Sequence, residues 1–140
     1  MINYFFENIE HIDISQNTSI WLENLIISEN KKPGEINYIF CDDDYLLKVN
    51  QDYLAHDYYT DIITFDYVKG KTISGDIFVS LPRILDNAST LSQDFESEFR
   101  RVLTHGLLHL CGYKDKTEEE ESTMRQKENF YINRYSNFSS

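Results

Sequence analysis

The segment from Phe95 to Cys111 constrains the fold more than any other part of this 140-residue chain. Its apolar residues recur at helical spacing and form one stripe, made up of Phe99, Val102, Leu103, Gly106 and Leu110. A helix with one apolar stripe is stable when that stripe packs against another apolar surface. His105 and His109 fall together beside the stripe, because four residues advance a helix by about 40° past one full turn. Gly112 is expected to end the helix.

The rest of the chain alternates between strand-like and helix-like segments. Runs rich in aromatic and β-branched residues predict strands at 1–6, 36–41, 61–67 and 76–80. Helical spacing predicts helices at 18–28, 42–54 and 81–91, and a capping box at 117–120 predicts a final helix. In the helix at 42–54 we expect Leu46, Leu47, Val49 and Tyr53 to point inward. Residues 32–34 are expected to form a turn, and 135–140 a frayed tail.

This order of elements predicts an α+β fold class. We expect a single layered domain over 1–140, in which helices cover a small mixed sheet of about four strands and the histidine-bearing helix packs on that sheet. The sequence has no apolar run near the ~20 residues that span a bilayer, and its first ten residues lack the features of a signal peptide. We therefore expect a cytoplasmic protein with no membrane partner, in which Cys41 and Cys111 are reduced thiols.

Three side chains near the end of the 95–111 helix have metal-ligand chemistry. His105 and His109, at i and i+4, project from one face and can hold one cation. Gly112 allows the chain to reverse, so Asp115 can return to the same ion. Three protein ligands with an open position are typical of catalytic zinc, so we expect one divalent metal ion, Zn²⁺ before others. The alternatives are histidines that are satisfied within the core and an Asp115 that is solvated beside Thr117.

The residue after the first histidine disfavours one large class of metal hydrolases. Zinc metalloproteases of the His-Glu-x-x-His form place a glutamate there as general base. Here that position is Gly106, which has no side chain to accept a proton. Peptide hydrolysis by that mechanism is therefore disfavoured, and a metal-dependent hydrolase of another substrate stays an alternative.

The segment from His105 to Asp115 resembles the signature of the YbeY family of endoribonucleases, H-G-x-L-H-L-x-G-Y-D-H. The matching positions are His105, Gly106, Leu108, His109, Leu110, Gly112 and Tyr113. Upstream, Asn50-x-x-Tyr53 followed by 60–65 resembles the family's N-x-x-Y-R … P-T-D-V-L-S-F-P, and 75–80 resembles its G-D-I-x-I-S strand. Met124 and Glu128 lie where the family has an acidic, methionine-containing closing helix. The resemblance runs from about Asn50 to Glu128, whereas 1–49 fit the family only loosely.

The resemblance implies a metal-dependent single-strand endoribonuclease that acts in ribosomal RNA processing and maturation and in ribosome quality control. Catalysis would fall to His105, His109 and Asp115 through metal-activated phosphodiester hydrolysis. Implied partners are ribosomal RNA and the small ribosomal subunit, with a small-subunit ribosomal protein and a ribosome-assembly GTPase. Thr60, Asp61 and Thr64 are expected at the edge of the substrate cleft, and cross-strand hydrogen bonding is the alternative explanation for them.

Two departures from the family pattern bear on the chemistry. Asp115 replaces the family's third histidine, which lowers the net charge of the site by one unit and makes manganese more competitive. Leu54 replaces an arginine that the resemblance places in catalysis. Arg101 lies one turn before the first histidine and is a candidate residue of the substrate cleft. The alternative for Arg101 is a surface ion pair with Glu96 or Glu98.

The net charge of −11 favours a second interpretation, because nucleic-acid affinity normally comes from Lys and Arg. Together with Leu54, it supports a non-catalytic ribosome-assembly factor with a structural metal as the alternative function. The acidic runs at 42–44 and 118–121, however, fall at expected helix starts, where they complement the helix dipole. The charge therefore does not exclude an enzyme whose cation lies in a cleft.

Overall fold

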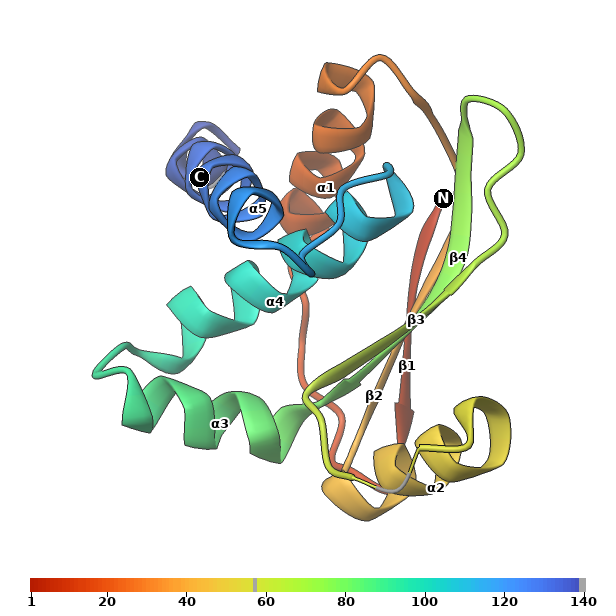
Figure 1. The fold of residues 1–140 in the computed structure, drawn as a ribbon. Coiled ribbons are helices and arrows are strands. Elements are labelled where there is room, and N and C mark those ends of the chain that lie inside the picture. The colour runs from red at the N-terminus through yellow and green to blue at the C-terminus, as the bar shows by residue number, and fades with distance from the viewer. Residues whose placement is uncertain (57, 139–140) are drawn as a thin grey trace.

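A mixed four-stranded sheet forms the centre of the computed structural model, which describes residues 1–56 and 58–138 (Figure 1). The strands are β1 (Ile2–Glu7), β2 (Lys32–Cys41), β3 (Ile62–Asp66) and β4 (Thr72–Ser80). Their order in the sheet is β1-β2-β4-β3. β1, β2 and β4 run parallel, and β3 pairs antiparallel with β4 at the edge. The expected α+β class and small mixed sheet are therefore confirmed.

The helices are α1 (Gln16–Ser28), α2 (Asp43–Leu54), α3 (Leu81–Thr90), α4 (Phe95–Leu110) and α5 (Glu118–Asn133). Each begins at a side-chain oxygen that accepts a hydrogen bond from a backbone N–H of the first turn. These N-caps are Ser15, Asp42, Ser80, Asp94 and Thr117. The acidic runs at 42–44 and 118–121 do lie at helix starts. No helix of the described residues has the length and apolar character needed to cross a bilayer.

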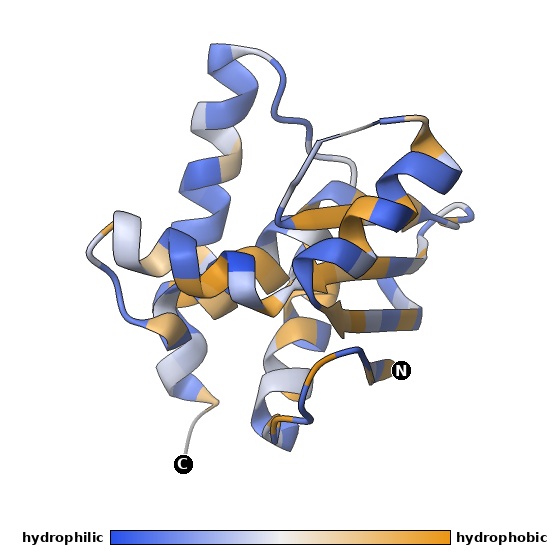
Figure 2. Cartoon of the chain, turned by 90° about the horizontal axis from the view of Figure 1, so that it is seen from below, coloured by the Kyte–Doolittle hydropathy of each residue, from blue (hydrophilic) through white to orange (hydrophobic). Residues whose placement is uncertain are grey.

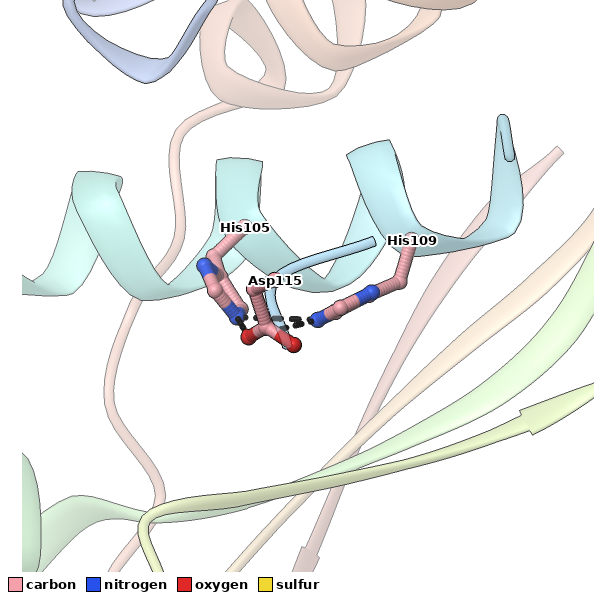
Figure 3. Close-up of side chains that lie close together, drawn as sticks. All are labelled: His105, His109 and Asp115. Carbon is pink, nitrogen blue, oxygen red and sulfur yellow. Dashed lines mark hydrogen bonds and ion pairs between the residues drawn. The ribbon is translucent and has the colours of Figure 1, made fainter. Parts of the chain in front are cut away.

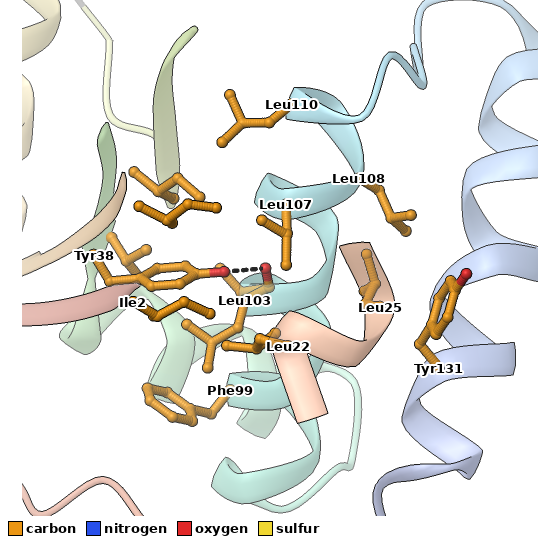
Figure 4. Close-up of a cluster of buried hydrophobic side chains, with 14 of the residues drawn as sticks. Ile2, Leu22, Leu25, Tyr38, Phe99, Leu103, Leu107, Leu108, Leu110 and Tyr131 are labelled. Atoms are coloured by element: carbon orange, nitrogen blue, oxygen red, sulfur yellow. Dashed lines mark hydrogen bonds between the residues drawn. The ribbon is translucent and has the colours of Figure 1, made fainter. Parts of the chain in front are cut away.

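Helix α4 packs its apolar stripe onto one face of the sheet, with α1 and α5 beside it (Figure 1). Figure 4 shows Leu103, Leu107 and Leu110 of α4 facing this core, where the Tyr38 hydroxyl donates to the Leu103 carbonyl at 2.9 Å. Gly106 lets the helix approach closely, because a Cβ there would lie 2.8 Å from Ile62 Cδ1 and 3.0 Å from Ile77 Cγ2. The absence of a side chain therefore sets the height of the two histidines above the sheet.

The opposite face of the sheet carries a second, smaller core under α2. Its buried residues are Cys41, Leu46, Val49 and Ile63. Ile62 and Ile63 therefore face opposite sides, as alternation along a strand requires. In Figure 2 the hydrophobic residues gather along the strands and the helix faces beside them. Cys41 and Cys111 are free thiols, as expected.

Three local expectations are wrong. Residues 32–34 belong to β2, where a register shift between Pro33 and Ile36 accommodates the proline that cannot donate to the ladder. Tyr53 is 72% exposed, because within the described part of the chain it contacts the sheet only through the edge-on packing of its ring with Phe65 of β3. Residues 135–137 form a 3₁₀ helix in which Tyr135 packs edge-on against Trp21, so the described part of the expected tail is ordered. Residues 139–140 of that tail lie outside the described residues.

Candidate metal centre

His105, His109 and Asp115 converge at the end of α4, each offering one ligand atom (Figure 3). The two Nε2 atoms lie 3.0 Å apart, and Asp115 Oδ2 lies 3.2 Å from His105 Nε2 and 3.3 Å from His109 Nε2. Four ligands held tetrahedrally at zinc–nitrogen distances of about 2.0–2.1 Å would be separated by roughly 3.3 Å. The spacing of these three donor atoms therefore fits a small divalent ion placed between them.

The other ring nitrogen of each histidine is occupied. His105 Nδ1 lies 2.6 Å from Glu128 Oε2, and His109 Nδ1 lies 2.9 Å from the Tyr113 carbonyl oxygen. A carboxylate and a carbonyl can only accept, so both Nδ1 atoms donate. In the neutral rings both Nε2 lone pairs then point at each other across 3.0 Å, where two acceptors repel. A cation shared with Asp115 resolves this repulsion, so the residues fit a metal ion.

Glu128 is the main electrostatic partner of the site. It is 3% exposed, and it receives Arg101 Nη1 at 2.8 Å in addition to His105. Burial opposes its ionisation, but the hydrogen bonds from His105 and Arg101 outweigh burial and lower the pKa of Glu128. Burial likewise disfavours protonated His105, but its hydrogen bond to Glu128 and the charges of Glu128 and Asp115 raise its pKa. The pocket therefore favours positive charge.

The loop that carries Asp115 is fixed at both ends. Gly112 has φ +109°, a left-handed conformation that a side chain would strain, and the next N–H returns to the Leu108 carbonyl. Downstream, the Thr117 hydroxyl accepts from the Glu120 N–H and the Glu120 carboxylate accepts from the Thr117 N–H. This capping box, expected from the sequence, places the N-cap of α5 two residues after Asp115.

A second buried carboxylate anchors the same loop. Glu29, which ends α1, accepts from the Tyr113 hydroxyl at 2.6 Å, from Lys127 Nζ at 3.3 Å and from the Tyr131 hydroxyl. Its side chain is only 9% exposed. Burial opposes ionisation, but these three donors outweigh it and lower the pKa of Glu29. Because the Tyr113 carbonyl orients His109, Glu29 connects α1 and α5 to the metal ligands.

Two pockets open beside His105. The larger, about 550 Å³, lies between the Asp115 loop and α5 and includes Glu118, Glu121, Met124 and Arg125 in its wall. The smaller, about 230 Å³, lies on the α4 side and includes Asp61, Ile62, Glu98 and Arg101. His105, Arg125 and Glu128 belong to both.

The structure separates the four expected cleft residues. Asp61 and Arg101 line the smaller pocket, whereas Thr60 and Thr64 line neither of the two pockets beside His105. Thr64 follows Ile62 by two residues, so it shares the strand face that is turned toward α4. Arg101 forms no ion pair with Glu96 or Glu98; it binds Glu128, and also Asn129 at 3.0 Å.

Comparisons with known proteins decide the family. The family model described as endoribonuclease YbeY matches residues 5–136. An endoribonuclease YbeY of Flavobacterium johnsoniae is 55% identical over 128 residues, covering 91% of this chain and 92% of that protein. The one from Christiangramia forsetii is 52% identical over 127 residues, covering 91% and 89%. The chain belongs to the endoribonuclease YbeY family.

Structural comparison agrees with this assignment. A solution structure of a protein from Thermotoga maritima superposes with a TM-score of 0.72 at 26% sequence identity, covering 96% of this chain and 89% of that one. The family match also covers residues 5–49, so it extends further toward the N-terminus than the segment from Asn50 to Glu128 that carries the sequence resemblance.

Sequence reasoning placed Glu128 in the closing helix but did not assign it to the YbeY site. Three residues of α5, Met124, Glu128 and Tyr131, are buried at helical spacing, and Glu128 is the one charged residue among them. A charged residue that falls on the apolar face of a helix is expected to be buried with that face. Because buried charges are almost always paired, such a residue signals a partner within the core. The Tyr113 carbonyl, by contrast, is a backbone group, so the sequence contains no signal that would identify it as the partner of His109.

Replacing Glu29 with glutamine is expected to lower the free energy of unfolding by about 2 kcal/mol at neutral pH, because hydrogen bonds to a charged acceptor are weakened. The folded-state pKa of Glu29 lies below its usual 4.5, so its stabilisation is present above that pH and is lost as the pH falls through the folded-state pKa. Urea unfolding should therefore show a wild-type advantage at pH 7 that shrinks below pH 4.5. The exposed Glu10→Gln is the control, and a constant difference across this range would contradict the role of Glu29.

Replacing Glu128 with alanine is expected to weaken Zn²⁺ binding by about 10- to 100-fold, because the partner that fixes the His105 ring is lost. Competition with a chelating dye measures this affinity, with circular dichroism to check that the variant folds. Glu119→Ala, an exposed change on the same helix, serves as the matched control. Equal zinc affinities for the Glu128 and Glu119 variants would refute this role.

Proposed function

We propose that this chain is a metal-dependent endoribonuclease that cleaves single-stranded segments of ribosomal RNA, acting in its processing and maturation and in ribosome quality control. The observation that carries the proposal is the convergence of two bare Nε2 atoms and the Asp115 carboxylate at one point on the wall of an open pocket. The YbeY relatives are named as endoribonucleases, which supplies RNA as the substrate class. We propose that residues 1–140 act as one domain.

His105, His109 and Asp115 would hold the ion, and Zn²⁺ suits two imidazoles with one carboxylate. When bound there, a divalent ion would polarise a phosphodiester oxygen and activate the attacking group. The protein supplies the positioning: Glu128 and the Tyr113 carbonyl keep both Nε2 atoms aimed at one point. Because Asp115 is a carboxylate, Mn²⁺ competes better here than at a site with three histidines.

Arg125 is the best candidate for the cation that replaces the family arginine at Leu54. Leu54 is not part of either pocket beside His105 in the described structure, whereas Arg125 lines both. Arg101 is already bound to Glu128 and Asn129. The Arg125 side chain is 61% exposed and touches Glu128 only at 3.6 Å, so it can move to a phosphate held at the metal. A guanidinium suits that task because it binds phosphate oxygens in pairs.

The alternative is a non-catalytic ribosome-assembly factor in which the metal fastens α5. The position of Glu128, a residue of α5 that binds a metal-ligand histidine of α4, supports such a structural role. In either case we propose a cytoplasmic protein that contacts the small ribosomal subunit, with a small-subunit ribosomal protein and an assembly GTPase as further partners. A nuclease assay separates the alternatives, because only the enzyme loses an activity when a ligand is changed without unfolding.

Changing His109 to alanine should remove one ligand and reduce cleavage of a short unstructured RNA by at least ~100-fold, since metal stabilisation of the transition state contributes several kcal/mol. Elemental analysis should show the parallel loss of bound metal. His56→Ala is the matched control, because His56 is an exposed loop histidine stacked on Tyr58. Cleavage that survives in the His109 variant would rule out the proposed metal mechanism.

Changing Arg125 to glutamine should lower kcat by about 10- to 100-fold while zinc affinity stays unchanged, because a cation that meets developing phosphate charge acts in the transition state. The control is Lys48→Gln, which removes the same charge from a side chain that is 76% exposed. A loss shared by both variants would indicate a general charge effect and would refute the specific role of Arg125.

A further inference from the structure

The smaller pocket beside His105 contains a buried acceptor that the proposed metal chemistry does not use. Glu98 is 5% exposed and lies in the pocket wall, and its Oε1 receives no hydrogen bond from any described residue. Burying an acceptor without a donor costs about 1–3 kcal/mol, so such groups in folded proteins call for a partner. Glu98 lines a pocket of about 230 Å³, and that volume leaves room for the partner to be a ligand that meets the carboxylate when its side chain turns toward the pocket.

Neighbouring charges do not compensate the burial of the Glu98 carboxylate. Arg101 is part of the same wall, but it donates to Glu128 and Asn129. Burial raises the pKa of Glu98, and the nearby charges of Asp61 and Glu128 raise it further, whereas Arg101 and Arg125 lower it by less. A carboxylate in the first turn of α4 also complements the helix dipole, but the exposed Glu96 provides that effect without any burial.

The position of Glu98 along α4 fits one nucleotide. It precedes His105 by seven residues, so it lies on the same face about 10 Å away along the helix axis. That is too far for proton transfer to a phosphate at the metal. The same distance is comparable with that from the phosphate of a nucleotide to the far edge of its base. Ile62 and Val102, also in the wall, offer apolar surface to the ring.

We propose that this pocket is a guanine subsite, in which Glu98 accepts hydrogen bonds from the base of a nucleotide whose phosphate lies at the metal centre. The inference deepens the proposed endoribonuclease function and rests on it for the phosphate. Guanine is the base that presents two adjacent N–H donors, N1 and N2, to a carboxylate. Adenine, cytosine and uracil each place an acceptor beside their donor, and that acceptor would face a carboxylate oxygen. Asp61 adds negative charge to the same wall and disfavours acceptor edges further.

Binding of the four 5′-nucleoside monophosphates, measured by calorimetric titration with and without Zn²⁺, tests the subsite independently of catalysis. We expect GMP to bind about tenfold more tightly than AMP, CMP and UMP, and Glu98→Gln to remove that preference, because the amide presents an N–H to a donor edge. Glu96→Gln, two residues earlier on α4 and exposed, should retain the preference. Equal binding of all four nucleotides by the wild-type protein, or a preference for another base, would overturn the proposal whether or not the Glu98 variant folds.

Cleavage of short RNA strands that differ in a single guanine separates failure of the subsite from failure of the proposed function. Selective GMP binding by a protein that does not cut RNA would support the subsite and refute the nuclease. Cleavage with no dependence on guanine and no change in KM for Glu98→Gln would support the nuclease and refute the subsite.

Discussion

The close approach of two histidine Nε2 atoms is the constraint on which the candidate site depends. Left to themselves, two imidazoles one turn apart would rotate to avoid facing lone pairs. Glu128 and the Tyr113 carbonyl prevent this by holding both Nδ1 atoms, and Asp115 closes the third side. The protein thereby concentrates acceptors at one point and leaves their mutual repulsion to be relieved by a cation. This preorganisation is what distinguishes the arrangement from two core histidines that satisfy themselves.

The same contacts hold α5 on the domain. Apart from Met124 and Tyr131, α5 buries little apolar surface, and its first turn is wholly acidic. Its attachment therefore depends on polar contacts, namely those of Glu128 with α4 and those of Lys127 and Tyr131 with Glu29, the C-cap residue of α1. Docking of α5 and assembly of the metal ligands are consequently one event. A bound metal would therefore stabilise the fold, and docking of α5 would in turn fix the positions of the metal ligands.

The features that the sequence predicts correctly are those whose residues lie close together in the chain. The α4 stripe, the spacing of His105 and His109, and the Gly112 turn are local patterns, and each was predicted correctly. The convergence of Asp115 on the histidines was also predicted, because only a short loop separates them. Glu128 was missed as a partner of His105, because 23 residues and a change of helix separate the two. The error at Pro33 has a related cause, since a turn signal was outweighed by pairing with a strand about 40 residues away.

The net charge of −11 is compatible with an RNA substrate because the charges are unevenly placed. The acidic runs at 42–44 and 118–121 lie at helix starts, where backbone N–H groups and the helix dipole offset part of their charge. The two pockets beside His105 contain two guanidinium groups and six carboxylates, so without a metal the site repels phosphate. A divalent ion halves this excess of negative charge and places positive charge where the ligands converge. Affinity for RNA would then reside at one small centre and not along a basic groove. Such a centre suits a flexible single strand, because a single strand can bend one phosphate into a pocket and the regular backbone of a duplex cannot.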